Sequence, residues 1–256
     1  MLLNSVVIIL REVLEAVLVV SLLLNISNYL GVSKRWFYIS LLLGFIAAFT
    51  YAMNYDVVSD YFDGLGQEIA SGVSLIIVFL CLAAITPALS GAGSQGLTRL
   101  SQYASLLAVS LLLCHEGAEV FVYMSGALAQ PDKQSLVLAG ASIGLGIGVS
   151  MGVFFYHSIG AIPESKARWC LLVLLALVAA GMSLQASQFL LQADLLPTTT
   201  VLWDSSEWLP ESSLVGQLLY ALLAYEASPS NLQVGIYTVC LALMLLLPNV
   251  FKRVLK

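Results

Sequence analysis

Two short motifs each place two glutamates three residues apart inside an otherwise apolar run. One motif reads REVLE from Arg11 to Glu15, and the other reads HEGAE from His115 to Glu119. Residues three apart project to the same side of a helix, so each motif offers two carboxylates on one face. An ionised carboxylate is costly in the hydrocarbon of a membrane, so matched pairs predict a water-lined or cation-filled site. The four candidate ligands are Glu12, Glu15, Glu116 and Glu119.

The chemistry of such a site follows from its oxygen ligands. Anionic oxygen ligands suit hard cations, so the cluster fits a ferric ion or a small divalent metal better than a soft metal. Arg11 and His115 stand four residues before Glu15 and Glu119, close enough on a helix to pair with them. These supporting residues leave two interpretations open: ion pairs that hold a metal site together, or structural ion pairs without a ligand. His115 itself is either a ligand or proton carrier, or a group that only orients Glu119.

The composition indicates a polytopic membrane protein. Of the 256 residues, 60% are hydrophobic and only 10% are charged, and the mean hydropathy is +0.95. This balance excludes an ordinary soluble globule. Apolar runs of roughly 20 residues, the length that spans about 30 Å of hydrocarbon as a helix, recur along the chain. We expect a single all-α domain over residues 1–256 with seven transmembrane helices: Asn4–Asn28, Trp36–Asn54, Gly66–Thr86, Tyr103–Gln130, Gln134–His157, Arg168–Gln192 and Asn231–Asn249.

The positions of the charges predict an orientation. Basic residues fall in alternate connections and at the C-terminus, which the positive-inside rule assigns to the cytoplasm. The N-terminus is then outside, and the outer connections are acidic, which raises the local concentration of cations. The candidate entry residues on that side are Glu68, Asp56, Asp60 and Asp63. Glu68 is equally well explained as a carboxylate in the first turn of a helix, where the dipole favours it.

The chain also shows a repeat when the two glutamate motifs are aligned. Ser40, Gly44 and Ala48 then fall on Gly144, Gly148 and Gly152. Three spans per copy is an odd number, which predicts an inverted 3+3 repeat plus one C-terminal helix. The expected units are repeat 1 at about 1–100, repeat 2 at about 101–195, an external loop with an interfacial helix at 196–228, and the last span at 231–250. The row of small residues predicts close helix packing, with a sliding surface as the alternative.

The first motif resembles the Arg-Glu-x-x-Glu signature of the oxidase-dependent iron transporters. This is the Ftr-type permease family of fungal high-affinity iron uptake and of bacterial EfeU. The second motif keeps both glutamates but has His115 where that family usually has arginine. Gln67-Glu68 and the stretch from Leu202 to Tyr237 are also similar to the family, so the resemblance covers essentially the whole chain.

The resemblance implies a permease that moves ferric or ferrous iron inward, with the motif glutamates binding the ion. It implies iron as the transported substrate rather than a permanently bound cofactor, and an external oxidase or metal-delivery protein as a partner. The expected location is the bacterial inner membrane. Sequence motifs of enzymes are absent, and nothing indicates nucleic acid as a partner. Two alternatives stay open: a permease for another cation such as lead or manganese, and a non-transporting intramembrane structural or signalling subunit.

Overall fold

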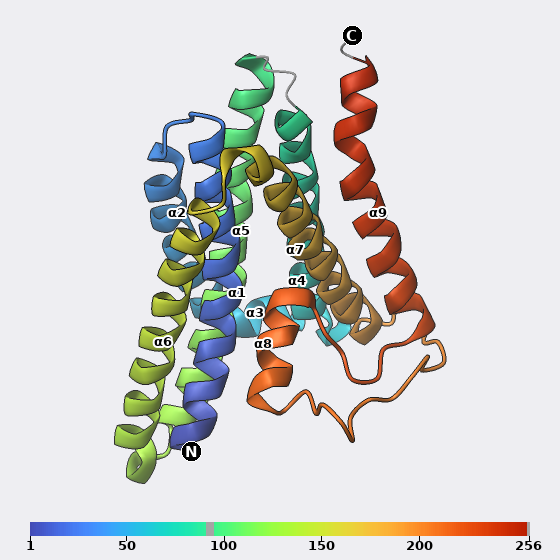
Figure 1. Ribbon diagram of the computed structural model, residues 1–256. Helices are drawn as coiled ribbons and strands as arrows, with labels where there is room; N and C mark the ends of the chain where they lie inside the picture. The colour runs from blue at the N-terminus through green and yellow to red at the C-terminus, as the bar shows by residue number, and fades with distance from the viewer. Residues whose placement is uncertain (91–94, 255–256) are drawn as a thin grey trace.

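The chain folds into long helices that run side by side (Figure 1). The computed structural model describes residues 1–90 and 95–254. Within this part, β-type pairing is limited to one isolated bridge between Val201 and Ser230. The all-α class expected from the sequence is therefore confirmed.

The long helices correspond to the predicted spans. Six of them are long and apolar enough to cross a membrane among the described residues; α1, which carries Arg11, Glu12 and Glu15, is not among the six. The long helices are α1 (Leu2–Tyr29), α2 (Arg35–Met53), α4 (Gly66–Ile85), α5 (Gln95–Leu128), α6 (Gln134–Gly160), α7 (Glu164–Gln192) and α9 (Asn231–Val254). The short ones are α3 (Tyr55–Asp60), η1 (Tyr61–Gly64), η2 (Thr86–Ser90), η3 (Pro131–Lys133) and α8 (Leu214–Leu223).

Several helices extend beyond the predicted apolar limits. Helix α5 begins at Gln95 rather than Tyr103, and α7 begins at Glu164, directly after Pro163. Hydropathy detects only the apolar part of a helix, whereas the backbone stays helical through polar residues until a breaker or cap ends it. A short helix, α8, lies within the stretch 196–228, where the sequence predicts one; the Ser213 hydroxyl accepts a hydrogen bond from the N–H of Gly216 at 3.0 Å. This contact is a side-chain N-cap.

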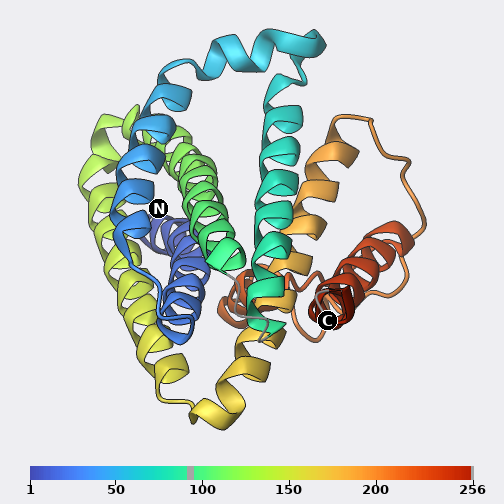
Figure 2. The same ribbon diagram turned by 90° about the horizontal axis from the view of Figure 1, so that it is seen from above.

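The helices are arranged in pairs. Helix α1 packs mainly against α6, α2 mainly against α5, and α4 against both α7 and α5. Seen from above, α4 and α7 lie between α9 and the side of the bundle that α2 and α6 form (Figure 2). Helix α9 contacts α7 and η2. The connections between α1 and α2 and between α6 and α7 lie at the same end as the C-terminus, whereas α1 begins at the other end (Figure 1).

A row of glycines explains the tight pairing of α1 with α6. Gly140, Gly144, Gly148 and Gly152 are the buried small residues of α6. A Cβ atom added at Gly144 would lie 2.6 Å from the backbone oxygen of Val6, and one at Gly148 would lie 2.6 Å from Val13. Such distances leave no room for a side chain, so the helices approach at backbone distance. The packing role predicted for this row is confirmed.

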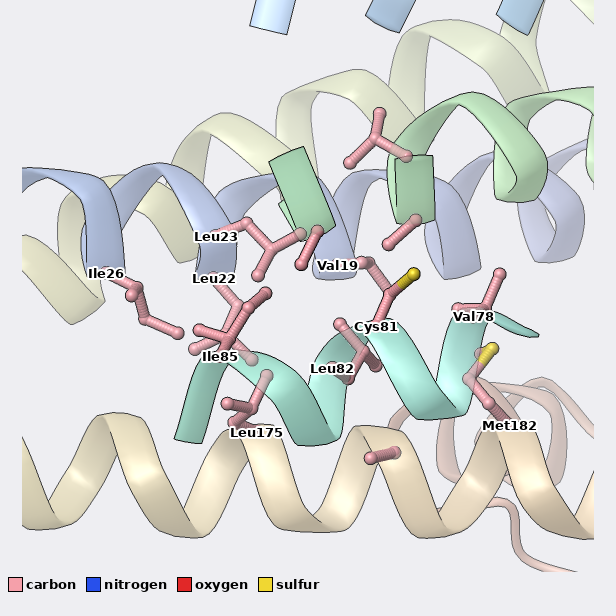
Figure 3. Packing of buried hydrophobic residues seen from close by; sticks show 14 of the residues in the cluster. Val19, Leu22, Leu23, Ile26, Val78, Cys81, Leu82, Ile85, Leu175 and Met182 are labelled. Atoms are coloured by element: carbon pink, nitrogen blue, oxygen red, sulfur yellow. The ribbon is translucent and has the colours of Figure 1, made fainter. Parts of the chain in front are cut away.

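The apolar core lies between the motif glutamates and the end of the bundle at which the C-terminus lies. It joins the second half of α1 to α4, α5 and α7 (Figure 3). The cluster includes Val19, Leu22, Leu23 and Ile26 of α1, Val78, Leu82 and Ile85 of α4, and Leu175 of α7. The four cysteines Cys81, Cys114, Cys170 and Cys240 are free.

Candidate metal site

The four motif glutamates come from two helices that pack against each other, α1 and α5. Glu12 and Glu15 are 3% and 4% exposed, and Glu116 is 4% exposed. The side chain of Glu119 is 32% exposed, so it is the most solvent-accessible of the four glutamates. The three-residue spacing therefore puts each pair on one helical face, as predicted, and these faces point into the bundle.

The four carboxyl groups are close enough to interact electrostatically. Glu116 interacts with Glu12, Glu15 and Glu119, and Glu15 interacts with Glu12 and Glu119. One oxygen of Glu116, Oε1, is buried and has no hydrogen-bond partner among the described residues. The structure thus gathers all four candidate ligands in one region. Within the described ranges, no three acidic, histidine or cysteine side chains are already positioned to hold a metal ion.

Arg11 lies between the two motifs. Its Nη2 and Nε atoms donate to Oε1 of Glu12 at 2.6 and 2.9 Å, and Nη2 is 3.7 Å from Oε2 of Glu119. The four-residue spacing predicted a pair with Glu15 instead, and no such ion pair is found among the described contacts. Arg11 therefore connects the two motifs rather than closing one of them.

Glu15 has a different partner, which the sequence analysis missed. The side-chain amide of Gln185, on α7, donates to Oε2 of Glu15 at 2.6 Å. Gln185 is 5% exposed. An amide within the mostly apolar sequence of α7 was the available signal, because a buried polar group needs a partner. Gln185, rather than Arg11, therefore supplies the hydrogen bond to Glu15.

His115 contacts Glu119, as its spacing predicts. The Nε2 atom is 3.4 Å from Oε1 of Glu119, and the imidazole ring packs edge-on against Phe189 with ring centroids 5.4 Å apart. The side chain is 8% exposed. The histidine is therefore held between an acidic group and an aromatic ring, which fits an orienting role for Glu119.

A cavity of about 520 Å³ lies beside this group. Arg11, Glu12, His115 and Glu119 form one part of its wall. Residues with hydroxyl or amide groups from α2, α3, α4 and α5 line another part: Tyr51, Tyr55, Gln67, Ser71 and Tyr123. The sequence analysis did not identify these tyrosines, because tyrosine is common at membrane interfaces for reasons unrelated to binding.

A second cavity of about 570 Å³ lies on the other side of Arg11. Its lining includes Gln188 of α7, Glu211 of the segment before α8, and Gln217 and Tyr220 of α8. The guanidinium carbon of Arg11 is 5.7 Å from the centre of the Tyr220 ring. Arg11 is the candidate-site residue that borders both cavities.

The predicted entry residues are less closely associated with the site. Asp56, Asp60 and Asp63 are exposed on α3 and η1, and none of them lines either cavity. Glu68 is half-buried, its Oε2 atom has no hydrogen-bond partner among the described residues, and it interacts electrostatically with Tyr51. Only Glu68 is therefore linked to the wall of the first cavity.

The comparisons with known proteins give one assignment, and it comes from a family model. Residues 2–251 match the family model described as the iron permease FTR1 family. No curated protein and no solved structure matches the chain. The match covers all of the motif residues discussed above.

Proposed function

Because the chain belongs to the iron permease FTR1 family, we propose that it carries ferric iron inward through the paired motifs of α1 and α5. Family membership makes it a multi-pass integral membrane protein with iron as the transported substrate. The observation that carries the proposal is the convergence of Glu12, Glu15, Glu116 and Glu119, of which Glu12 and Glu119 line a cavity bordered by polar groups.

The choice of ferric iron rests on ligand chemistry. The candidate site offers carboxylate oxygens from four residues, and hard, highly charged cations favour such ligands. Cysteine does not border either cavity. The tyrosine hydroxyl groups of the first cavity are further oxygen donors on the same side.

We also propose that α1 is a seventh span and that the two halves form an inverted repeat. The contacts of α1 with α6 have their counterpart in those of α5 with α2, while α4 packs against its own counterpart, α7. A pseudo-twofold axis would produce this pattern. The glycine contacts favour a register of the repeat in which α2 is shifted by one helical turn along α6 relative to the sequence alignment. The alignment places Gly44 on Gly148 and Ile9 on Leu113. In the structure, however, Gly44 contacts Leu113 as Gly144, not Gly148, contacts Ile9.

The inward direction follows from the proposed orientation. The cavity linings include Ile8 and Arg11 from the first half of α1, and α1 begins at the end of the bundle that is the outer one if the basic connections are cytoplasmic. The proposed location is a bacterial inner membrane. An external oxidase or metal-delivery protein would then meet the surface formed by α3, η1 and the segment before α8.

The test is iron uptake into liposomes that contain the purified protein. Substituting Gln for Glu12, Glu15, Glu116 or Glu119 should reduce ferric uptake steeply, because each change removes a charge that offsets the cation. Glu164→Gln, at the exposed start of α7, is the matched control and should transport normally. If ferrous, manganese or lead ions were taken up in preference to ferric ions, the assignment of ferric iron as the substrate would be wrong, and the preferred ion would take its place. Equal uptake by wild type and all four variants would overturn the ligand role, and no uptake of any metal would favour a structural subunit.

A further inference from the structure

Arg11 occupies the boundary between the two cavities, and its guanidinium lies on the side of the motif carboxylates. There it contacts Oε1 of Glu12 through two nitrogens and approaches Oε2 of Glu119. A metal ion bound by these two carboxylates would need the same oxygens. Since the guanidinium and the metal are both positive, they also repel each other at contact distance. The two cations therefore compete for one place.

The second cavity contains groups that suit a guanidinium. The Tyr220 ring already lies 5.7 Å from the Arg11 Cζ atom, within the range of a cation–π contact. The Glu211 carboxylate and the side-chain oxygens of Gln188 and Gln217 line the same space. The Arg11 side chain is 41% exposed, so neighbouring atoms leave it room to turn. A guanidinium that left Glu12 would find an acidic group and an aromatic face next to it.

We propose that Arg11 is a tethered cation that leaves Glu12 and Glu119 when iron binds and is received by Glu211 and Tyr220 in the second cavity. This inference rests on the proposed function, because it takes Glu12 and Glu119 as iron ligands. Arg11 is then a positioning residue: it holds the two motifs together through Glu12 and Glu119, and it gives way to the substrate.

The exchange links binding to a particular part of the molecule. Glu211 belongs to the segment that precedes α8, and its Oε1 atom accepts the backbone N–H of Ala227 at 2.6 Å. Tyr220 belongs to α8 itself. Arrival of the Arg11 side chain would therefore draw α8 and its flanking segments toward α1. Metal binding would in this way change the position of α8 and of the external segment that precedes it.

A double-mutant cycle tests the exchange directly. The probe is ferric ion supplied as its nitrilotriacetate complex, with binding to the purified protein measured by calorimetry. Glu211→Gln keeps an oxygen acceptor for Ala227 but removes the charge that receives Arg11. It should weaken iron binding roughly three- to tenfold when Arg11 is present. In an Arg11→Gln background the same change should have no effect, because no guanidinium needs to be received.

Control variants separate this effect from general charge or folding. Glu207→Gln changes the same charge at an exposed position of the same external segment and should leave binding unchanged in both backgrounds. Tyr220→Leu provides a second cycle with Arg11→Gln, should Glu211→Gln fail to fold. It should also weaken binding only when Arg11 is present.

The outcomes distinguish the two proposals. If Glu211→Gln and Tyr220→Leu weaken binding equally with and without Arg11, or not at all, the exchange is wrong even if Glu12 and Glu119 bind iron. If Glu12→Gln and Glu119→Gln bind iron as tightly as wild type, the proposed function fails first. If iron binding still depends on Glu12 but the effect of Glu211→Gln is the same with and without Arg11, only the proposed role of Arg11 is overturned.

Discussion

Gly144→Ala should destabilise the pairing of α1 with α6, and the size of the effect follows from the local geometry. The added Cβ atom would lie 2.6 Å from the backbone oxygen of Val6 and 3.1 Å from the backbone nitrogen of Leu10. Neither atom can move without α1. Ordinary van der Waals contact begins near 3.4 Å, so the helices would have to separate locally by about 0.8 Å. Overpacking of this kind costs about 1–3 kcal/mol.

The neighbouring glycine of α6 supplies the matched control. A Cβ atom at Gly146 meets nothing within 4 Å. Gly146→Ala should therefore stabilise the protein by up to roughly 1 kcal/mol, the usual gain of alanine over glycine in a helix. The same gain applies to Gly144→Ala and leaves it destabilised by about 0–2 kcal/mol.

The assay is equilibrium unfolding of the two variants in the same lipid or detergent system. The gain of alanine over glycine is common to both variants, so we expect their unfolding free energies to differ by the overpacking cost alone, about 1–3 kcal/mol, which corresponds to roughly 5- to 150-fold in the equilibrium constant. Equal stability of Gly144→Ala and Gly146→Ala would refute the reasoning, because it would mean that α1 and α6 do not depend on backbone contact at Gly144.

Further predictions concern the groups around the site and the segment between α8 and α9. Gln185→Leu removes the donor to Glu15 and should lower the unfolding free energy by about 1–3 kcal/mol; a Leu variant as stable as wild type would contradict this. His115→Arg keeps a donor for Glu119 and should hold iron uptake within about threefold of wild type, whereas His115→Leu should fall further. Burial raises the pKa of Glu226 to about 7. Its protonated form is therefore favoured on folding, so attachment of its segment should be strongest in acid and weaken as the pH rises through about 7. Hydrogen exchange across residues 224–230 should show this trend in wild type and lose it in Glu226→Gln.

The sequence was sufficient for the parts of the site that depend on one helix. The spacing of Glu12 and Glu15 determined their shared face, and the same holds for the second motif. The contact of His115 with Glu119 also follows from a four-residue spacing. These relations are local, and helix geometry alone determines them.

Contacts between helices were harder to predict. Arg11 was expected to pair with Glu15, but the amide of Gln185 holds Glu15, and Arg11 contacts Glu12 and Glu119. That outcome depends on how α7 sits against α1, and the sequence gives no information about it without an alignment of homologues.

Helix ends were predicted with uneven success. Helix α4 begins at Gly66 as expected, because a turn precedes it, whereas α5 begins well before the apolar part of its sequence. The short helices α3 and η1 were not expected at all. Their residues mix polar and apolar side chains and are too few to show the periodicity from which the longer helices were predicted.

The apolar cluster beyond the motif glutamates has a consequence for transport kinetics. Val19 follows Glu15 by one helical turn and belongs to the cluster that includes Leu22, Leu82 and Leu175. A bare ion does not enter such packed hydrocarbon, where the idealised cost of leaving water is of order 20 kcal/mol. An ion bound at Glu15 could therefore proceed only if α1 separated from α4 and α7. Each crossing would need one such opening, so flux should saturate with substrate and follow the rate of helix motion, as in a carrier, rather than rise steadily as in an open channel.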